Sequence, residues 1–296
     1  MPYSEYYQKL VLDDIKRFIG ISRPVRSSIL HRLLIRKLPI TALHPNPNDE
    51  FCDPQIGPNE GIIADYMKAY RVNQLHGDPP ISEKLTVERM STGGYMLLNG
   101  HHRWMAAAKM GMEQVPVSVV NTVTEEEIIS AVNRSDKQMC VSFDLDEVLL
   151  TDCNSDQADH PLPFPYNLLL KKTLRKNAGA MINELQMQGF DVWVYSGSAI
   201  SVEEVQRIMS LHHTKINGIV NFVKGKKPSP TLKQAFRSKY VLSVHVDNES
   251  ILWVNTQTKE YDSVPVTGGQ NWSADVFAKI TAPDQLKSLK GAPVHA

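Results

Sequence analysis

The sequence predicts an α/β protein with two folded domains, and three observations lead to this prediction. The chain has 296 residues, about twice the usual size of one domain. In its second half, short apolar runs alternate with helical patterns, which is typical of a doubly wound parallel sheet. Its first half instead contains a hairpin pattern and an alanine-rich helical pattern, which indicates a smaller α+β domain.

The composition narrows the class of protein. Hydrophobic residues make up 42% and charged residues 22% of the chain, as in an ordinary globular protein. The 32 Lys and Arg residues balance the 32 Asp and Glu residues. This balance argues mildly against a protein that binds duplex DNA, because such proteins usually have a surplus of basic residues. The cysteines lack disulfide or zinc spacing, the N-terminus lacks a signal-peptide core, and no apolar run could span a bilayer. We therefore expect a cytoplasmic protein.

Residues 1–37 form a basic N-terminal segment. Apolar residues recur at helical spacing over residues 3–19, and a second apolar face follows over residues 29–35. One interpretation is a docking surface for anionic partners, since basic residues outnumber acidic ones here. The other, which we favour, is a helical pair that packs on the next domain and leaves a solvated charged rim.

The first folded domain spans residues 38–121, and its most informative motif is Gly100-His101-His102-Arg103. A hairpin over residues 85–98 leads into this motif, and the alanine-rich helix follows it directly. The glycine allows close backbone approach, and the start of a helix offers N–H groups with a partial positive charge. We therefore expect a phosphate-type anion site here. In the competing interpretation, one histidine caps the helix and Arg103 pairs with a nearby acid.

The second folded domain spans residues 138–285, after a polar connector at residues 122–137 and before a loose tail at residues 286–296. After the first strand of this domain, we expect a loop over residues 151–166 and a long helix over residues 167–188. Such a loop is too short for a large cap domain.

Polar side chains follow three of the apolar strands in this second domain. Asp144 and Asp146 end the first strand, Ser196 ends the next one, and Asp247 ends a later one. Because ligands bind beyond the carboxyl ends of parallel strands, we expect these side chains to converge on one site. Two carboxylates side by side repel each other unless a cation lies between them. Mg²⁺ prefers oxygen ligands, so we expect it to be that cation.

Residues 38–121 resemble the ParB N-terminal/sulfiredoxin-like domain. The matching pieces are Asp78-Pro79-Pro80-Ile81, the strand into Asn99-Gly100-His101-His102-Arg103, the alanine-rich helix, and Gln114-Val115-Pro116-Val117. The resemblance implies that Gly100, His101, His102 and Arg103 bind a nucleoside triphosphate, ATP or CTP. Sulfiredoxins place a catalytic cysteine where this chain has His101, so their chemistry is not expected. Kinase members use an acid, for which Glu50 and Glu60 are the candidates.

The second domain resembles the haloacid dehalogenase-like (HAD) hydrolases, which implies a Rossmann-like doubly wound sheet with a minimal cap. The matching positions, in motif order, are Asp144, Asp146, Ser196, Lys227 and Asp247, with Lys224 as the competing lysine. The resemblance implies that Asp144 is the nucleophile and Asp146 the general acid and base. Ser196 and a lysine would bind the phosphoryl oxygens, and Asp144, Asp146 and Asp247 would hold Mg²⁺.

These resemblances together predict a Mg²⁺-dependent phosphatase that acts through an aspartyl-phosphate and carries an N-terminal nucleotide-binding domain. Two alternatives stay open. One is a bifunctional kinase and phosphatase. The other is a nucleotide-regulated, nucleic-acid-associated binding protein whose HAD site is residual. The sequence does not name the phosphorylated substrate, and it predicts no membrane partner.

Overall fold

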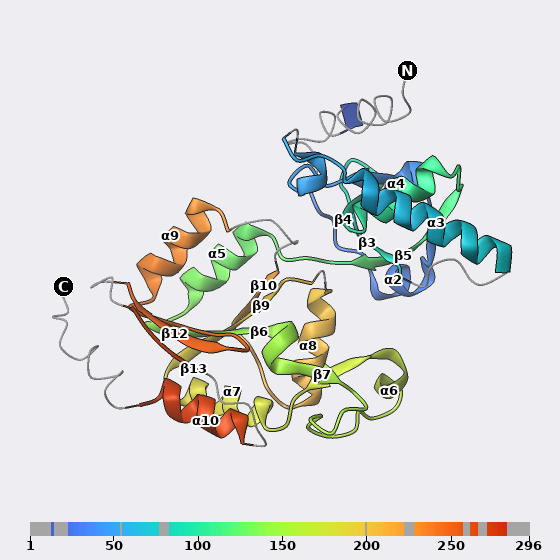
Figure 1. Ribbon diagram of the computed structural model, residues 1–296. Coiled ribbons are helices and arrows are strands. Elements are labelled where there is room, and N and C mark those ends of the chain that lie inside the picture. The colour runs from blue at the N-terminus through green and yellow to red at the C-terminus, as the bar shows by residue number, and fades with distance from the viewer. Residues whose placement is uncertain are drawn as a thin grey trace. The chain divides into compact units, whose positions relative to one another are not determined.

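The computed structural model describes residues 13–14, 23–53, 55–76, 83–198, 200–221, 228–256, 261–265 and 271–282. The chain divides into two compact units, which are described separately (Figure 1). The first contains the described residues up to Thr122 and Ser198–Val202; the second contains Val123–Gly197, Glu203–Asn221 and the described residues from Pro228 onwards. The helix expected over residues 3–19, apart from residues 13 and 14, and the tail at residues 286–296 lie outside the described residues.

A five-stranded mixed sheet forms the centre of the first unit, in the order β1-β5-β3-β4-β2. Its strands are β1 (Lys37–Pro39), β2 (Leu43–Pro45), β3 (Leu85–Arg89), β4 (Tyr95–Asn99) and β5 (Gln114–Val120). The predicted hairpin is confirmed, since β3 pairs with β4 in antiparallel register and Arg89 lies opposite Tyr95. β5 pairs in parallel with β3 on the other side.

Helices cover this sheet and enclose its core. They are α2 (Ile29–Leu34), α3 (Glu60–His76) and α4 (His101–Lys109), with short 3₁₀ turns η1 (Ile40–Ala42) and η2 (Glu50–Cys52). α3 lies against α4 (Figure 1). Ala106 and Ala107 of α4 are completely buried against sheet residues such as Val87 and Leu97. On α2, by contrast, Leu30 remains 70% exposed, so its apolar face is only partly covered within the described chain.

A six-stranded sheet forms the centre of the second unit, in the order β10-β9-β6-β11-β12-β13. Its strands are β6 (Met139–Asp144), β9 (Phe190–Ser196), β10 (Gly218–Asn221), β11 (Leu242–Val246), β12 (Ser250–Asn255) and β13 (Tyr261–Pro265). β10, β9, β6 and β11 run parallel, whereas β12 and β13 are antiparallel additions at one edge. The sheet is therefore mixed rather than purely parallel, and the unit is α/β.

Helices lie on both faces of this second sheet. They are α5 (Glu125–Arg134), α7 (Ala178–Met187), α8 (Val202–Leu211), α9 (Pro230–Lys239) and α10 (Trp272–Ile280). Figure 1 shows α5 beside α9 on one face and α7 beside α10 on the other. α5 occupies the segment expected as a connector. It starts at a capping box in which the Thr124 side chain accepts from the Glu127 amide, and the Glu127 side chain accepts from the Thr124 amide.

The prediction of one long helix over residues 167–188 is wrong. A short helix α6 (Tyr166–Leu169) is followed by strand β8 (Lys172–Leu174), which pairs with β7 (Leu150–Asp152) in an antiparallel hairpin. Two features explain the break. Thr173 and Leu174 are completely buried, which fixes this stretch as a strand, and Asn177 has a left-handed φ of 62°, which no continuous helix accommodates.

Among the described residues, no helix combines the length and apolar character needed to cross a membrane.

Candidate functional sites

The corner between β4 and α4 is built on Gly100. Its φ of 97° lies in the left-handed region, and a Cβ at this position would lie 2.5 Å from the Cδ2 atom of Leu85. Gly100 also serves as the N-cap of α4, and it supplies no side-chain hydrogen bond to the first turn. The amide groups of that turn consequently face the corner without a side-chain cap, as an anion site requires.

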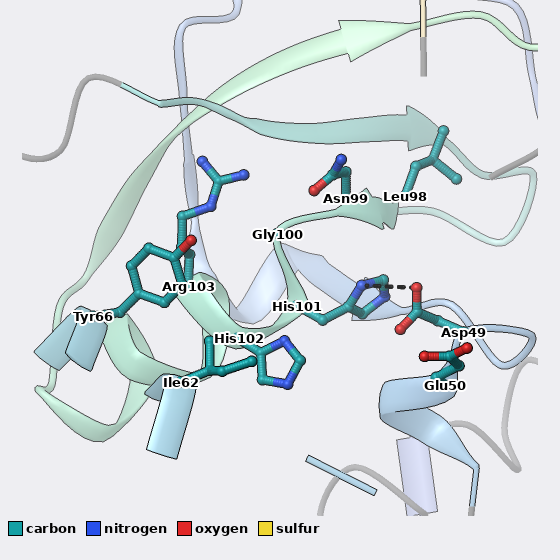
Figure 2. Close-up of a pocket in the computed structure, with 10 residues that line it drawn as sticks. All are labelled: Asp49, Glu50, Ile62, Tyr66, Leu98, Asn99, Gly100, His101, His102 and Arg103. Carbon is teal, nitrogen blue, oxygen red and sulfur yellow. Dashed lines mark ion pairs between the residues drawn. The ribbon is translucent and has the colours of Figure 1, made fainter. Parts of the chain in front are cut away.

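A cavity of about 370 Å³ opens at this corner, within the size range of small-molecule sites. Its lining consists of Asp49, Glu50, Ile62, Tyr66, Leu98, Asn99, Gly100, His101, His102 and Arg103. Figure 2 shows Arg103 and Tyr66 toward one end, and His101, Asp49 and Glu50 toward the other, with Gly100 between them. The structure thus brings the four predicted corner residues together at one cavity.

The two histidines of the corner act as acceptors for neighbouring loops. His101 Nε2 accepts from the Asn46 amide at 3.1 Å, and His102 Nε2 accepts from the Asn59 amide at 3.1 Å. Phe51 packs against both imidazole rings, with centroid distances of 5.4 Å and 5.2 Å. Neither histidine caps α4, so that part of the competing interpretation does not hold.

Burial lowers the pKa of His101 to about 4, although the nearby Asp49 carboxylate opposes the shift. Its ring is therefore neutral at pH 7, with Nδ1 directed at Asp49 Oδ2 at 3.4 Å. Burial also lowers the pKa of His102. Burial thus disfavours a positive charge on either histidine. They shape the cavity, while the helix start and Arg103 supply the attraction for an anion.

Arg103 combines both roles that the sequence left open. It lines the cavity, and its Nη1 atom lies 3.1 Å from the Glu83 carboxylate. The Glu83 side chain is 68% exposed, so this ion pair is well solvated and weak. A phosphate group, which accepts two parallel hydrogen bonds from a guanidinium, is a stronger partner for Arg103.

The structure separates the two acids considered for a kinase role. Glu50 lines the cavity, whereas the Glu60 carboxylate lies 2.6 Å from Lys109 Nζ in an ion pair. Only Glu50 therefore lies where it would face a ligand at the corner.

A second candidate site lies at the carboxyl ends of β9, β6 and β11, which are neighbours in the second sheet. Asp144 ends β6, and its Oδ1 atom accepts from the Glu147 amide at 2.7 Å. This bond caps a single π-helical turn, η3 (Leu145–Leu149), a local irregularity that is frequent at functional sites. Leu145, between the two acids, is completely buried and so points away from solvent, as predicted, whereas Asp144 and Asp146 are partly exposed.

Asp146 and Ser196 meet directly across two neighbouring strands. The Ser196 hydroxyl donates to Asp146 Oδ2 at 2.9 Å, and Ser196 is only 3% exposed. The predicted acid–base residue and the predicted phosphate-binding hydroxyl are therefore in contact. Their pairing holds the Asp146 carboxylate at the strand ends.

Asp247 is the third predicted acid of this site, and it follows β11, on the other side of β6 from β9. Burial opposes its ionisation, but the amides of Ser250 and Glu249 outweigh this effect and hold the pKa of Asp247 below its usual value. On the same strand, burial lowers the pKa of His245, while Asp247 and Asp144 both act in the opposite direction. Both carboxylates thus lie within electrostatic reach of one imidazole, which indicates that they face a common region.

Lys224 and Lys227 lie outside the described residues, so their positions relative to these acids stay predictions. In the described part of the chain, three potential metal-ligating side chains gather within 4.8 Å at Asp159, His160 and His212. Sequence analysis missed this group, because the fold brings His212 to the Asp159-His160 pair from about fifty residues away. No spacing motif marks it.

Comparisons with known proteins show similarity over part of the chain. No curated protein matches the chain. A crystal structure of a C-terminally truncated chromosome-partitioning protein ParB from Caulobacter crescentus, complexed with CTP-gamma-S, matches with 28% identity over 35% of this chain and 55% of that one, at a TM-score of 0.24. A structure of the same protein with the centromeric parS site matches with 27% identity over 34% and 49% of the two chains, at a TM-score of 0.22. This chain spans about half the length of each.

The family comparison is more specific about position. Residues 76–135 match the ParB N-terminal domain, a stretch that includes β3, β4, α4 and β5. The Gly100–Arg103 corner lies within the matched stretch. The chain therefore contains a ParB N-terminal domain at residues 76–135.

Proposed function

We propose that the first unit binds a nucleoside triphosphate, CTP or ATP, at the Gly100–Arg103 corner. The observation that carries this proposal is the cavity at the start of α4, which is lined by Arg103 and whose Gly100–Arg103 side lies in the stretch that matches the ParB N-terminal domain. Amide groups of the first helical turn and the guanidinium would hold the phosphate oxygens.

The charges around the cavity indicate at which end the triphosphate would bind. Asp49 and Glu50 would repel phosphate at their end, so the triphosphate belongs at the Gly100–Arg103 end. Ile62 of α3 also lines the cavity and offers apolar surface for the nucleoside.

The test is calorimetric titration of CTP and of ATP into the full chain, beside Arg103→Ala and Arg89→Ala. Arg103→Ala should weaken binding at least about tenfold, because a charge-assisted bidentate contact is lost. Arg89 is exposed at the end of β3 and is not among the cavity-lining residues, so its variant should bind like the wild type. Melting curves show whether each variant is folded. Equal affinity of the folded Arg103 variant and the wild type would contradict the proposal.

A second candidate function, phosphate ester hydrolysis, is favoured by the geometry of the second unit. Three neighbouring parallel strands bring these groups together. Asp144 ends β6 and Asp146 follows it, Ser196 ends β9 and contacts Asp146, and Asp247 follows β11. In the proposed reaction, the Asp144 carboxylate attacks phosphorus and the bond to the ester oxygen breaks, while Asp146 gives that oxygen its proton. Water then attacks the aspartyl-phosphate and Asp146 takes up the water's proton. Phosphate leaves and Asp144 is regenerated.

The donor set at these strand ends fits Mg²⁺, because the groups that would hold it are all oxygens: the carboxylates of Asp144 and Asp247 and the Asp146 carbonyl. A bound Mg²⁺ would offset the repulsion between carboxylate and phosphate. Ser196 would turn its hydroxyl from Asp146 toward a phosphoryl oxygen. Hydrolysis of an aryl phosphate with and without Mg²⁺ tests this function, and no turnover with Mg²⁺ present would favour a residual site.

A further inference from the structure

The Asp159–His160–His212 cluster lies within the second unit and shares no residue with the acidic strand ends. Asp159 and His160 belong to the segment between β7 and α6, and His212 directly follows α8. Asp159 Oδ2 lies 2.9 Å from His212 Nδ1 and 3.1 Å from His160 Nδ1. The two imidazole rings are 4.3 Å apart, so one nitrogen of each ring converges on the same carboxylate oxygen.

Neighbouring groups hold both the imidazole and the carboxylate in place. His212 Nε2 lies 2.8 Å from the Thr173 hydroxyl, and Asp159 Oδ1 accepts from the Asn177 amide at 3.1 Å. In the ion-bound form, His212 would carry its proton on Nε2, where the Thr173 hydroxyl accepts it, and Nδ1 would present its lone pair to the ion. Metal-binding histidines are commonly oriented in this way by a hydrogen bond at the other ring nitrogen.

The cluster is closed on one side and open on the other. The His212 side chain is fully buried, Asp159 is 27% exposed, and His160 is 45% exposed. The start of α7 packs closely on the buried side of the cluster, since a Cβ on Gly179 would lie 3.2 Å from the His212 carbonyl. An ion bound here would have three protein ligands and one position toward solvent.

A second interpretation of this cluster would be catalytic. A Thr–His–Asp nucleophile is a poorer interpretation, because Thr173 is completely buried and no substrate reaches it.

We propose that Asp159, His160 and His212 form a site for a borderline divalent transition-metal ion, for which Zn²⁺ is the probe. Two imidazole nitrogens and one carboxylate oxygen suit Zn²⁺, whereas Mg²⁺ prefers oxygen ligands throughout. Through these ligands, the bound ion would link the segment after β7, which carries Asp159 and His160, to His212 after α8. This site is independent of both functions proposed above.

The test is a Zn²⁺ titration of the full, tag-free chain against a competing chelator dye, with Mg²⁺ in excess to fill oxygen-only sites. Two matched substitutions decide it. His160→Asn removes a partly exposed ligand, whereas His213→Asn changes the next residue after His212. His213 is exposed and has a left-handed φ of 52°, a conformation that asparagine accepts.

We expect one Zn²⁺ per chain in the wild type and in His213→Asn, and at least about a tenfold weaker affinity in His160→Asn. Asp159→Asn should lose affinity in the same way. Absence of a tight site in the wild type, or unchanged affinity in folded His160→Asn, would overturn the proposal.

Discussion

At the Gly100–Arg103 end of the cavity in the first unit, the groups that face a ligand are backbone N–H donors and the Arg103 guanidinium, and Asp49 and Glu50 lie at the other end. The strand ends of the second unit instead present carboxylates and one hydroxyl. A phosphate group can bind the first set directly. At the second set it meets negative charge, so it requires a cation between itself and Asp144 and Asp247.

If both proposed functions hold, the two sites would therefore differ in mechanism and in cofactor requirement. Binding at the corner should tolerate removal of Mg²⁺, whereas turnover at the strand ends should not. The following predictions test the contrast, from the largest expected effect to the smallest.

Asp144→Asn should reduce aryl phosphate hydrolysis at least about a thousandfold, because the neutral amide cannot attack phosphorus. Nucleotide affinity of the first unit should stay unchanged. Glu147→Gln is the matched control, since Glu147 is exposed and contacts Asp144 through its backbone amide alone. Initial rates with purified full-length variants provide the measurement. A rate for Asp144→Asn equal to that of Glu147→Gln would remove Asp144 from the reaction.

Acidification should destabilise the first unit through His101. Its pKa falls from 6.5 in the unfolded chain to about 4 when buried, so the unfolded state binds more protons between these values. Stability is thus fully present above pH 6.5 and is lost as the pH falls toward 4, by up to about 3 kcal/mol. Hydrogen exchange of the α4 amides, corrected for intrinsic pH effects, measures this loss. The same pH dependence in His101→Gln would assign it to another group.

Gly100→Ala should cost about 1–3 kcal/mol of stability, since it adds a clash with Leu85 to an unfavourable backbone conformation. Gly111→Ala is the control at the other end of α4. Its φ of 68° is also left-handed, but a Cβ there would meet nothing within 4 Å, so about 1 kcal/mol is expected. Urea denaturation gives both values. Equal costs would show that backbone strain alone fixes this glycine.

Glu50→Gln should tighten nucleotide binding in the absence of Mg²⁺ by about threefold, because a negative charge that lines the cavity is removed. Glu60→Gln should leave affinity unchanged, since Glu60 is paired with Lys109. Calorimetry without Mg²⁺ distinguishes the two. Weaker binding in Glu50→Gln would mean that this acid accepts a hydrogen bond from the ligand.

Local sequence signals predicted the elements that position both sites. Gly100 between a strand and an alanine-rich helix located the corner, and acids after apolar strands located the second site. Period-two and period-3.6 patterns are set by which face of an element is buried, so they can be read before the fold is known.

Tertiary contacts determined what the sequence could not indicate. The β7–β8 hairpin depends on burial of Thr173 and Leu174 in a stretch too short to show a period. The lowered pKa of His101 depends on its burial in the folded unit, which no local pattern shows. The Asp159–His212 contact likewise depends on tertiary packing, in which α7 contacts the segment that follows α8.

The most direct test of the central claim is hydrogen exchange of the full chain with and without saturating CTP, and then ATP. The account predicts slower exchange at the amides from Gly100 to Trp104, where the start of α4 would hold the triphosphate, and no change at η3 beside Asp144. Nucleotide binding that leaves these amides unprotected, or that protects η3 instead, would contradict it.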